Sequence, residues 1–296
     1  MMANSDRRQV PGYFRQAVGG CVVTAIYDGY INLSPSLFHG VDDDTMQTLI
    51  GKKHKMRISE DIPTSVTTYL IDNGRSKTLL NVGGAGGTMG NILENLRASG
   101  CSPADIQSVL LTHMHFDHVC GLVNEDGAAV FSNATVYASE GESRFWLDPQ
   151  NAKSAPEAAK AFFEMAVNSI QPYKDRGRFK TFSGHVEVLP GIEAFPSPGH
   201  TPGHTSYLVG DGHERLLLWG DIVHSHALQF SHPEVTNDFD ADQPQAAATR
   251  ASIFQKAAAD NLLIGGDHLP FPGFGYMQKD SQGYAWVPVE YAALDM

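Results

Sequence analysis

The stretch Thr112-His113-Met114-His115-Phe116-Asp117-His118 decides how this chain is interpreted, and it directly follows the apolar run Val109-Leu110-Leu111. Three histidines and one aspartate fall within six residues. An apolar strand that ends in such a cluster presents several nitrogen and oxygen donors at one edge of a sheet, as a borderline-soft divalent metal requires. The alternative is a histidine-rich surface loop, but imidazoles crowded against a strand repel one another when protonated. The stretch therefore predicts a metal site.

Three further donors follow apolar segments later in the chain. His200 lies in the turn-rich loop from Pro198 to His204, whose glycines allow the backbone to approach an ion closely. Asp221 follows the apolar run Leu216 to Trp219, and His268 follows a third strand-like run and two glycines. Each donor stands at or just beyond the end of an expected strand, where α/β sheets usually build their sites. We therefore expect these side chains to meet the first cluster.

This ordered set of donors resembles the metallo-β-lactamase superfamily of hydrolases. The resemblance rests on H-x-H-x-D-H at 113–118 and on the order of the later donors. Within the superfamily the chain is most similar to the branch of methyl parathion hydrolase and bacterial lactonases, over nearly its whole length from Pro11 to Val289. The resemblance implies a dinuclear centre whose ligands form three sets: His113, His115 and His200 on one ion, Asp117, His118 and His268 on the other, and Asp221 as the bridge. Two zinc ions are expected, although iron, manganese or cobalt would also suit these ligands.

Such a centre has a straightforward hydrolytic chemistry. A centre with imidazole and carboxylate ligands leaves positions open for water. The pKa of a water shared by two cations is lowered towards or below the ~7 typical of one zinc-bound water, so it is a hydroxide at neutral pH. That hydroxide is a nucleophile, and the second ion polarises the oxygen under attack. Asp117 and Asp221 are expected to be catalytic in this sense, because they hold the ions.

Three neighbouring residues are expected to modify this centre. His224 follows Asp221 by three residues. Its position resembles the one at which acyl-homoserine lactonases have a tyrosine that contacts the substrate carbonyl. A histidine there would polarise the carbonyl or protonate the leaving oxygen, unless it is only a hydrogen-bonded structural residue. His204 is expected to support the ligands without binding metal. Asn81 departs from the family, which usually has an aspartate there that supports the metal ligands, so metal affinity or water acidity is expected to shift.

The expected substrate pocket is aromatic. Six side chains lie in segments expected to cover the site, although a place in the core would explain any one of them equally well: Phe38, Trp146, Phe162, Phe163, Phe230 and Phe239. No arginine cluster marks a phosphate monoester or nucleotide. The substrate should therefore be small, neutral and partly apolar.

Composition narrows the class of protein further. With 21 Lys+Arg against 33 Asp+Glu the net charge is −12, which disfavours nucleic acid as a partner. No apolar run approaches the ~18 residues of a membrane span, and the polar start Met1 to Gln9 contains no signal-peptide core. Cys21, Cys101 and Cys120 suit reduced thiols. We therefore expect a cytoplasmic enzyme, with an exported form whose leader is missing as the alternative.

The chain pattern predicts an α/β fold. Strands are expected at 21–27, 66–71, 78–82, 135–138, 186–189, 192–195, 206–209 and 216–219, and helices at 89–98, 140–147, 155–170 and 243–259, with Asp148-Pro149 in a connection. Two strand-rich halves with helices outside predict an αββα sandwich of two central mixed β-sheets flanked by helices, as the resemblance also implies. Because the donors must converge, residues 1–296 are expected to form one domain, with residues 1–10 as a flexible N-terminal segment.

The expected function is metal-dependent hydrolysis of lactones or of aryl and alkyl esters. An organophosphate triester hydrolase is the nearest alternative, since the same hydroxide can attack phosphorus. A β-lactamase, a thioesterase resembling glyoxalase II, a persulfide dioxygenase and a catalytically silent metal sensor are more distant alternatives. The apolar segments Pro11 to Phe14 and Leu37-Phe38 predict a surface that is covered in a homodimer.

Overall fold

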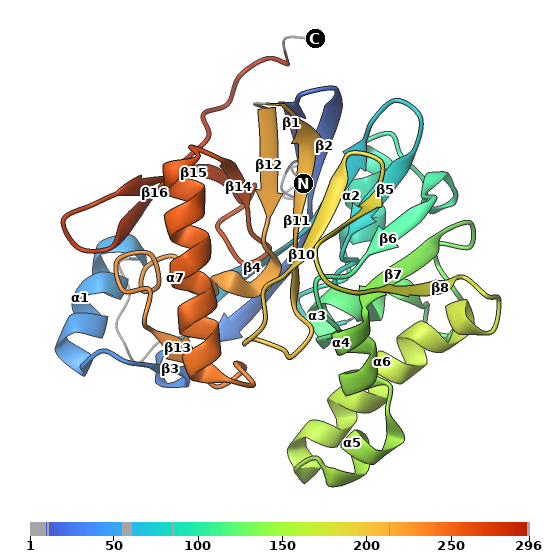
Figure 1. Ribbon diagram of the computed structural model, residues 1–296, viewed down its shortest axis with the longest axis horizontal. Helices are drawn as coiled ribbons and strands as arrows, with labels where there is room; N and C mark the ends of the chain where they lie inside the picture. Colours follow the sequence, from blue (N-terminus) through green and yellow to red (C-terminus); the bar gives the residue numbers. More distant parts are fainter. Residues whose placement is uncertain (1–9, 11, 55–60, 85, 213, 295–296) are drawn as a thin grey trace, which may run out of the picture.

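Two seven-stranded sheets lie face to face, with helices on their outer sides (Figure 1). The computed structural model describes residues 10, 12–54, 61–84, 86–212 and 214–294. The expected flexible segment, residues 1–10, lies outside these residues except for Val10, and so does Pro11. Among the described residues, no helix is long and apolar enough to span a membrane.

The first sheet contains the N-terminal strands. Its order is β1 (Tyr13–Val18), β2 (Cys21–Leu33), β4 (Ile62–Asp72), β5 (Lys77–Leu80), β6 (Ser108–Leu110), β7 (Thr135–Ser139) and β8 (Phe179–Phe182). Strands β1, β2, β4 and β5 pair antiparallel, whereas β5, β6, β7 and β8 are parallel to one another. Parallel pairing places the ends of these strands at one edge, so residues that follow β6 emerge there.

The second sheet contains the C-terminal strands. Its order is β16 (Tyr284–Pro288), β15 (Phe274–Lys279), β14 (Leu263–Gly265), β12 (Glu214–Leu218), β11 (Thr205–Asp211), β10 (Ile192–Pro196) and β9 (Val186–Leu189). Only the pair β12 and β14 is parallel among these strands as described. A separate two-stranded ribbon joins β3 (Phe38–His39) to β13 (Thr236–Asn237).

Helices cover both outer faces (Figure 1). The α-helices are α1 (Asp43–His54), α2 (Ile92–Ala98), α3 (Phe116–Val119), α4 (Glu140–Trp146), α5 (Pro149–Ser154), α6 (Glu157–Lys174) and α7 (Gln243–Ala259). Short 3₁₀ turns are η1 (Pro35–Leu37), η2 (Pro103–Asp105), η3 (Cys120–Leu122) and η4 (Gly220–Ile222). In Figure 1, α7 stands in front of the second sheet, and α5 and α6 project from the end of the first.

Alternation along the central strands explains why they are apolar without interruption. In β12, Leu216 and Leu218 face the first sheet, while Leu217 packs in the cluster beneath α7. In β5, Leu80 lies between the sheets and Leu79 packs beneath α2. Strands covered on both faces need apolar side chains at every position, and burying each one contributes about 1.5–3 kcal/mol. This packing fixes the strand ends that carry the donors.

The predicted αββα sandwich is confirmed, and helix 243–259 has the expected bounds. The expectation that Asp148-Pro149 lies in an irregular connection between helices is wrong. The Asp148 side chain accepts a hydrogen bond from the backbone nitrogen of Gln150, and Pro149 occupies the first helical turn, so α5 forms there. Of the segments expected to face a partner, Phe38 is only 4% exposed, whereas Phe14 and Leu37 are partly buried against apolar clusters.

Candidate metal centre

The strand ends bring all seven predicted donors to one edge of the sandwich. After β6 the chain continues to Thr112, whose backbone nitrogen donates to Asn81 Oδ1 at 3.0 Å, and then reaches the histidine cluster. Helix α3 starts directly after His115, so Asp117 and His118 fall in its first turn. The remaining three donors follow strands β10, β12 and β14 of the other sheet: His200, Asp221 and His268.

The first donor group converges on a point between three imidazoles. His115 Nδ1 lies 3.0 Å from His113 Nε2 and 2.9 Å from His200 Nε2. Asp221 Oδ2 lies 3.5 Å from His113 Nε2 and 3.3 Å from His200 Nε2. These four atoms belong to one group of donors that are close enough together to share a metal ion.

The second group lies on the other side of the same aspartate. Asp117 Oδ2 is 3.4 Å from both His118 Nε2 and His268 Nε2. Asp221 Oδ1 lies 3.2 Å from His118 Nε2, and Asp221 Oδ2 lies 3.1 Å from His268 Nε2. Asp221 therefore faces both groups, as a bridging carboxylate would.

The charges of these side chains depend strongly on one another. Burial alone would raise the pKa of Asp221, but the imidazoles of His118 and His268 hold it well below its usual value. Burial lowers the pKa of His113, and its histidine neighbours lower it further. Burial opposes a charge on His118 and His268, but Asp221 and Asp117 raise the pKa of both imidazoles. The charges of the histidines and carboxylates in this space are therefore tied to one another.

The donor set fits divalent ions. Within the described part of the chain, Asp221 Oδ1 and His118 Nε2 are buried without a hydrogen-bond partner, although buried polar atoms are normally paired. Both atoms face the donor groups, where a cation would satisfy them. Mixed imidazole and carboxylate ligands are those of zinc, iron, manganese and cobalt sites.

Four of the histidines are held from behind by oxygen atoms. His200 Nδ1 lies 3.0 Å from Asp240 Oδ1, and His268 Nδ1 donates to the carbonyl oxygen of Ser65 at 2.9 Å. The remaining two contacts join His113 Nδ1 to Thr112 Oγ1 at 3.0 Å and His118 Nδ1 to Asp267 Oδ2 at 3.1 Å. The acceptors behind His200 and His268 place a ring proton on Nδ1 and direct Nε2 towards the centre.

Asn81 belongs to this outer layer. It adopts a positive φ of 57° after β5, and its Nδ2 donates to Thr112 Oγ1 at 3.0 Å and to Asp267 Oδ2 at 2.5 Å. The carboxylate that approaches His118 thus comes from Asp267 in this chain. Sequence reasoning did not single out Asp267; its signal was its place between two glycines and His268.

Glu142 is a second residue that sequence reasoning missed. It is 1% exposed, and its Oε1 accepts hydrogen bonds from Met114 N at 2.9 Å and Trp146 Nε1 at 2.6 Å. Its Oε2 accepts from Thr201 Oγ1 at 2.8 Å and Gly203 N at 3.1 Å. Burial raises the pKa of this carboxyl, and its donors oppose the rise. One carboxylate therefore ties the 113–118 segment to the loop that carries His200.

His204 and His224 occupy different positions around Asp221. His204 Nε2 accepts from the backbone nitrogen of Asp221 at 3.1 Å, and its Nδ1 contacts Ser197, so both nitrogens are engaged. Its expected supporting position agrees with these contacts. His224 Nε2 instead lies 3.1 Å from Asp221 Oδ2, and its ring stacks on His268 and on Phe239.

A cleft of about 170 Å³ opens above these donors. Its polar floor contains donors from both groups, and its walls are apolar: Ile31, Leu33, Phe116, Phe162 and Phe239. Of the aromatic side chains expected to line a pocket, Phe162 and Phe239 do so, and they are 37% and 39% exposed. The cleft is therefore a narrow apolar slot over a polar floor.

The other four predicted pocket residues lie elsewhere. Trp146 and Phe163 line a neighbouring hollow of about 380 Å³ behind His115 and His200. Phe38 packs with Leu33 and Ile50, and Phe230 packs beneath α7, so neither lines the cleft. Expecting Phe38 and Phe230 there was wrong, because apolar side chains suit a core as well as a pocket.

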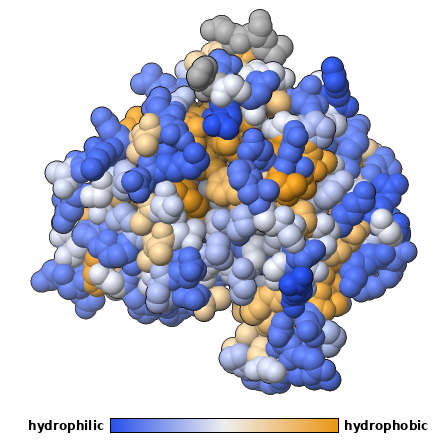
Figure 2. Space-filling model, viewed as in Figure 1, coloured by the Kyte–Doolittle hydropathy of each residue, from blue (hydrophilic) through white to orange (hydrophobic). Residues whose placement is uncertain are grey.

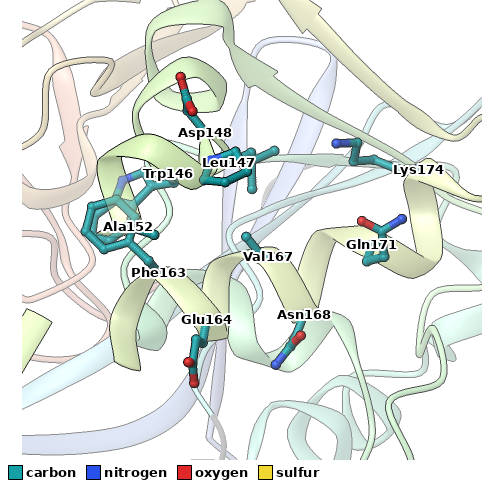
Figure 3. Close-up of a pocket in the computed structure, with 11 residues that line it drawn as sticks. Trp146, Leu147, Asp148, Ala152, Phe163, Glu164, Val167, Asn168, Gln171 and Lys174 are labelled. Atoms are coloured by element: carbon teal, nitrogen blue, oxygen red, sulfur yellow. The ribbon is translucent and has the colours of Figure 1, made fainter. Parts of the chain in front are cut away.

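A larger cavity of about 440 Å³ lies between α4, α5 and α6 (Figure 3). Trp146 and Phe163 lie together at one end, and Gln171 and Lys174 lie at the other. Its described lining residues include no histidine. In the face shown by Figure 2, hydrophilic residues predominate and apolar residues gather above the projection made by α5 and α6.

Known proteins share this sequence and architecture. An N-acyl homoserine lactonase of Bacillus cereus is 31% identical over 127 residues, which are 43% of this chain and 42% of the lactonase. The chain thus matches less than half the length of that relative. The crystal structure of the hydrolase AbOPH of the beta lactamase superfamily has a TM-score of 0.91 at 36% identity, covering 97% of this chain and 100% of that one. AidC, a dizinc quorum-quenching lactonase, shares the fold with a TM-score of 0.85 at 24% identity, covering 95% and 99%.

Two sheets that gather histidines and aspartates at a common edge define a class of metal-dependent hydrolases. Residues 61–270 of this chain match the metallo-beta-lactamase superfamily along most of the sandwich. The chain belongs to the metallo-beta-lactamase superfamily.

Proposed function

We propose that this protein is a dinuclear metallohydrolase that opens lactones or cleaves aryl and alkyl esters. Asp221, which faces both donor groups, carries this proposal. We assign His113, His115 and His200 to one ion and Asp117, His118 and His268 to the other. When bound, the two ions supply a nucleophilic water at neutral pH and withdraw charge from the oxygen under attack.

His224 completes the proposed site from the side of the cleft. Burial lowers its pKa to about 4, so the ring is neutral at neutral pH. Its Nε2 lies 3.1 Å from Asp221 Oδ2, at the boundary between donors and cleft. A neutral N–H there donates to a carbonyl oxygen as that atom becomes negative, and removing one such donor costs about 10²–10³ in kcat.

The shape of the cleft supports a small, planar substrate. Its volume of about 170 Å³ lies below the ~300–1,000 Å³ of pockets for drug-sized ligands. Phe162 and Phe239 offer flat apolar walls, which suit a lactone ring or an aryl ester with an apolar substituent. The lactonase relatives support the same substrate class. A bulky tetrahedral phosphotriester would press its substituents against the His224 ring.

The test compares two substrates on His224 variants. We expect the wild type to have a higher kcat/KM for a lactone than for a phosphotriester such as methyl parathion. His224→Leu should lower lactone hydrolysis about 10²–10³-fold and raise phosphotriester hydrolysis, because it removes a donor and opens apolar space. His226→Leu, on the same loop but outside the cleft and packed against Trp286, is the matched control. A wild-type preference for the phosphotriester, or an unchanged ratio in His224→Leu, would contradict this proposal.

We further propose zinc as the metal, a single domain, a cytoplasmic location and a homodimer. Elemental analysis should give two zinc ions per chain after expression in zinc-containing medium. Anomalous scattering from a single ion, with Asp117 and His268 unengaged, contradicts the dinuclear assignment. Light scattering at micromolar concentration should report a dimer, and a mass of 32.1 kDa alone would overturn that assignment.

A further inference from the structure

His224 has a neighbour that decides where its proton lies. Asn237, in the short strand β13, is fully buried, and its Nδ2 lies 3.2 Å from His224 Nδ1. The same amide contacts the backbone through its other end: Oδ1 accepts a hydrogen bond from Phe239 N at 2.9 Å. A backbone nitrogen can only donate, so the atom that faces it must be the amide oxygen.

The orientation of this amide fixes the tautomer of the ring. With Oδ1 towards Phe239, the NH₂ group of Asn237 faces His224 and donates to Nδ1. A neutral imidazole whose Nδ1 accepts must carry its proton on Nε2. That nitrogen lies 3.1 Å from Asp221 Oδ2, and His224 lines the cleft.

Buried neighbours hold both partners in place. Asn237 N donates to Asp240 Oδ2 at 3.1 Å, which anchors the strand. Gln229 Oε1 accepts from the backbone nitrogens of His224 at 2.8 Å and Ser225 at 3.1 Å. The Asn237–His224 contact is therefore a fixed part of the site.

The group that contacts Nδ1 of His224 differs from those that contact Nδ1 of the proposed metal ligands. Behind His200 and His268 stand acceptors, a carboxylate and a carbonyl, which leave bare Nε2 atoms for a metal. Behind His224 stands a donor, which leaves an N–H on Nε2. Although Asp221, His224 and His268 lie close enough together to form a metal site, a protonated Nε2 cannot bind one.

We propose that Asn237 is a positioning residue that fixes His224 as the Nε2–H tautomer, so that His224 donates into the cleft and stays outside the metal ligands. The group that would accept this hydrogen bond is a substrate oxygen that gains negative charge during the reaction, such as the carbonyl oxygen of a lactone or an ester. This inference rests on the proposed function for the identity of that substrate, whereas the tautomer itself rests only on the contacts of Asn237.

Nuclear magnetic resonance of the zinc-loaded, ¹⁵N-histidine-labelled protein tests the tautomer directly. The His224 signals are assigned by their loss in His224→Gln. We expect the wild-type ring to carry its proton on Nε2. In Asn237→Asp, the carboxylate keeps an acceptor for Phe239 N but accepts from Nδ1, so the proton should move to Nδ1. A wild-type ring protonated on Nδ1 overturns the inference without any variant.

Kinetics and metal content give a second readout. Asn237→Asp should lower kcat for a lactone about 10²–10³-fold, the usual cost of one lost donor, with little change in KM. With Nε2 bare, zinc analysis should show altered affinity. Gln229→Glu is the control for charge: it adds the same charge at a buried amide beside His224 and keeps the acceptor for its backbone. It loses the bond from Gln229 Nε2 to Val235 O, but that oxygen keeps its second donor, Arg250 Nη1. It should retain the wild-type tautomer.

The outcomes separate this inference from the proposed function. If His224→Gln hydrolyses lactones as fast as the wild type, the donor role of His224 in the proposed function is wrong, whatever the tautomer. If His224→Gln is slow but Asn237→Asp keeps the wild-type tautomer and kcat, only the role of Asn237 is wrong. An equal change of tautomer in Gln229→Glu also contradicts it, because charge alone would then be the cause.

Discussion

Two hollows of this protein differ in size and in chemistry. The cavity of Figure 3 measures about 440 Å³ and has a mixed lining, in which Trp146 and Phe163 are buried and the polar residues are exposed. The cleft above the donors measures about 170 Å³ and has buried histidines and aspartates in its floor. Trp146 lines the first, and its ring lies 5.3 Å from that of His115, which lines the second.

The difference suggests a rule for choosing between hollows: buried polar groups, rather than volume, distinguish the candidate site. Burying a charged side chain costs several kcal/mol unless partners compensate it. The polar groups around the larger cavity are local and solvated: Asp148 caps its own helix, and Gln171 bonds Asp175 one turn away. In the cleft, partners come from distant segments. Each prediction below tests this contrast, beginning with the largest expected effect.

Replacing the shared carboxylate should have the largest effect. Asp221→Ala removes the group that faces both donor sets, so we expect kcat to fall on the order of 10³-fold or more, since metal chemistry supplies several kcal/mol. Elemental analysis should show less than two ions per chain. Full activity of Asp221→Ala would contradict its bridging role.

Replacing Glu142, the buried carboxylate that joins the 113–118 segment to the His200 loop, should chiefly lower stability. Glu142→Gln turns an NH₂ group towards one of two donor pairs, so we expect the free energy of unfolding to fall by about 1.5–3 kcal/mol. Glu140→Gln, on the same helix and paired with Arg144 at the surface, should change it by less than about 1 kcal/mol. Equal melting curves for the two variants in differential scanning calorimetry would contradict this structural role of Glu142.

A smaller effect is expected behind His200. Asp240→Asn keeps an oxygen but loses the charge that faces His200 Nδ1, so zinc affinity should fall about 10–100-fold in a chelator competition titration. The exposed Asp238→Asn, whose carboxylate pairs with His39, should leave zinc affinity unchanged. If both variants bind zinc equally, Asp240 does not orient this ligand.

The smallest effect is expected in the larger cavity. Val167→Phe fills the space in Figure 3 and should leave kcat/KM within about twofold, because surface changes away from special sites have small effects. Phe162→Ala, on the same helix but in the cleft wall, should raise KM about tenfold, since about 1.4 kcal/mol of apolar contact is lost. A strong kinetic effect of Val167→Phe would place the cavity in the substrate site.

The sequence predicts the structural roles that follow from a residue's own chemistry and its neighbours in the chain. It does not predict roles that depend on residues brought together only by the fold. The run Leu216-Leu217-Leu218 indicates a strand covered on both faces, and histidines with aspartate indicate a metal wherever they meet. The role of Glu142 depends on Met114 and Gly203, which only the fold brings to it. As Ser139-x-x-Glu142, it would pass for a helix cap.

The same limit explains the other errors. Phe38 and Phe239 are chemically identical, so only packing decides that one is buried in a core and the other lines the cleft. Helix α1 was not predicted, because it buries only a narrow strip, including Met46 and Ile50, and is otherwise polar. Asn237 gave no signal, since an asparagine acts there only through the ring that it faces.

The division of the donors between the two sheets has a kinetic consequence. The 113–118 cluster follows a strand of the first sheet, whereas His200, Asp221 and His268 follow strands of the second. Under the proposed assignment, ions held by both groups would cross-link segments far apart in sequence, and the sheets would have to release them before they could part. The native sandwich would then open more slowly with its metals bound, and a chelator would shorten its lifetime.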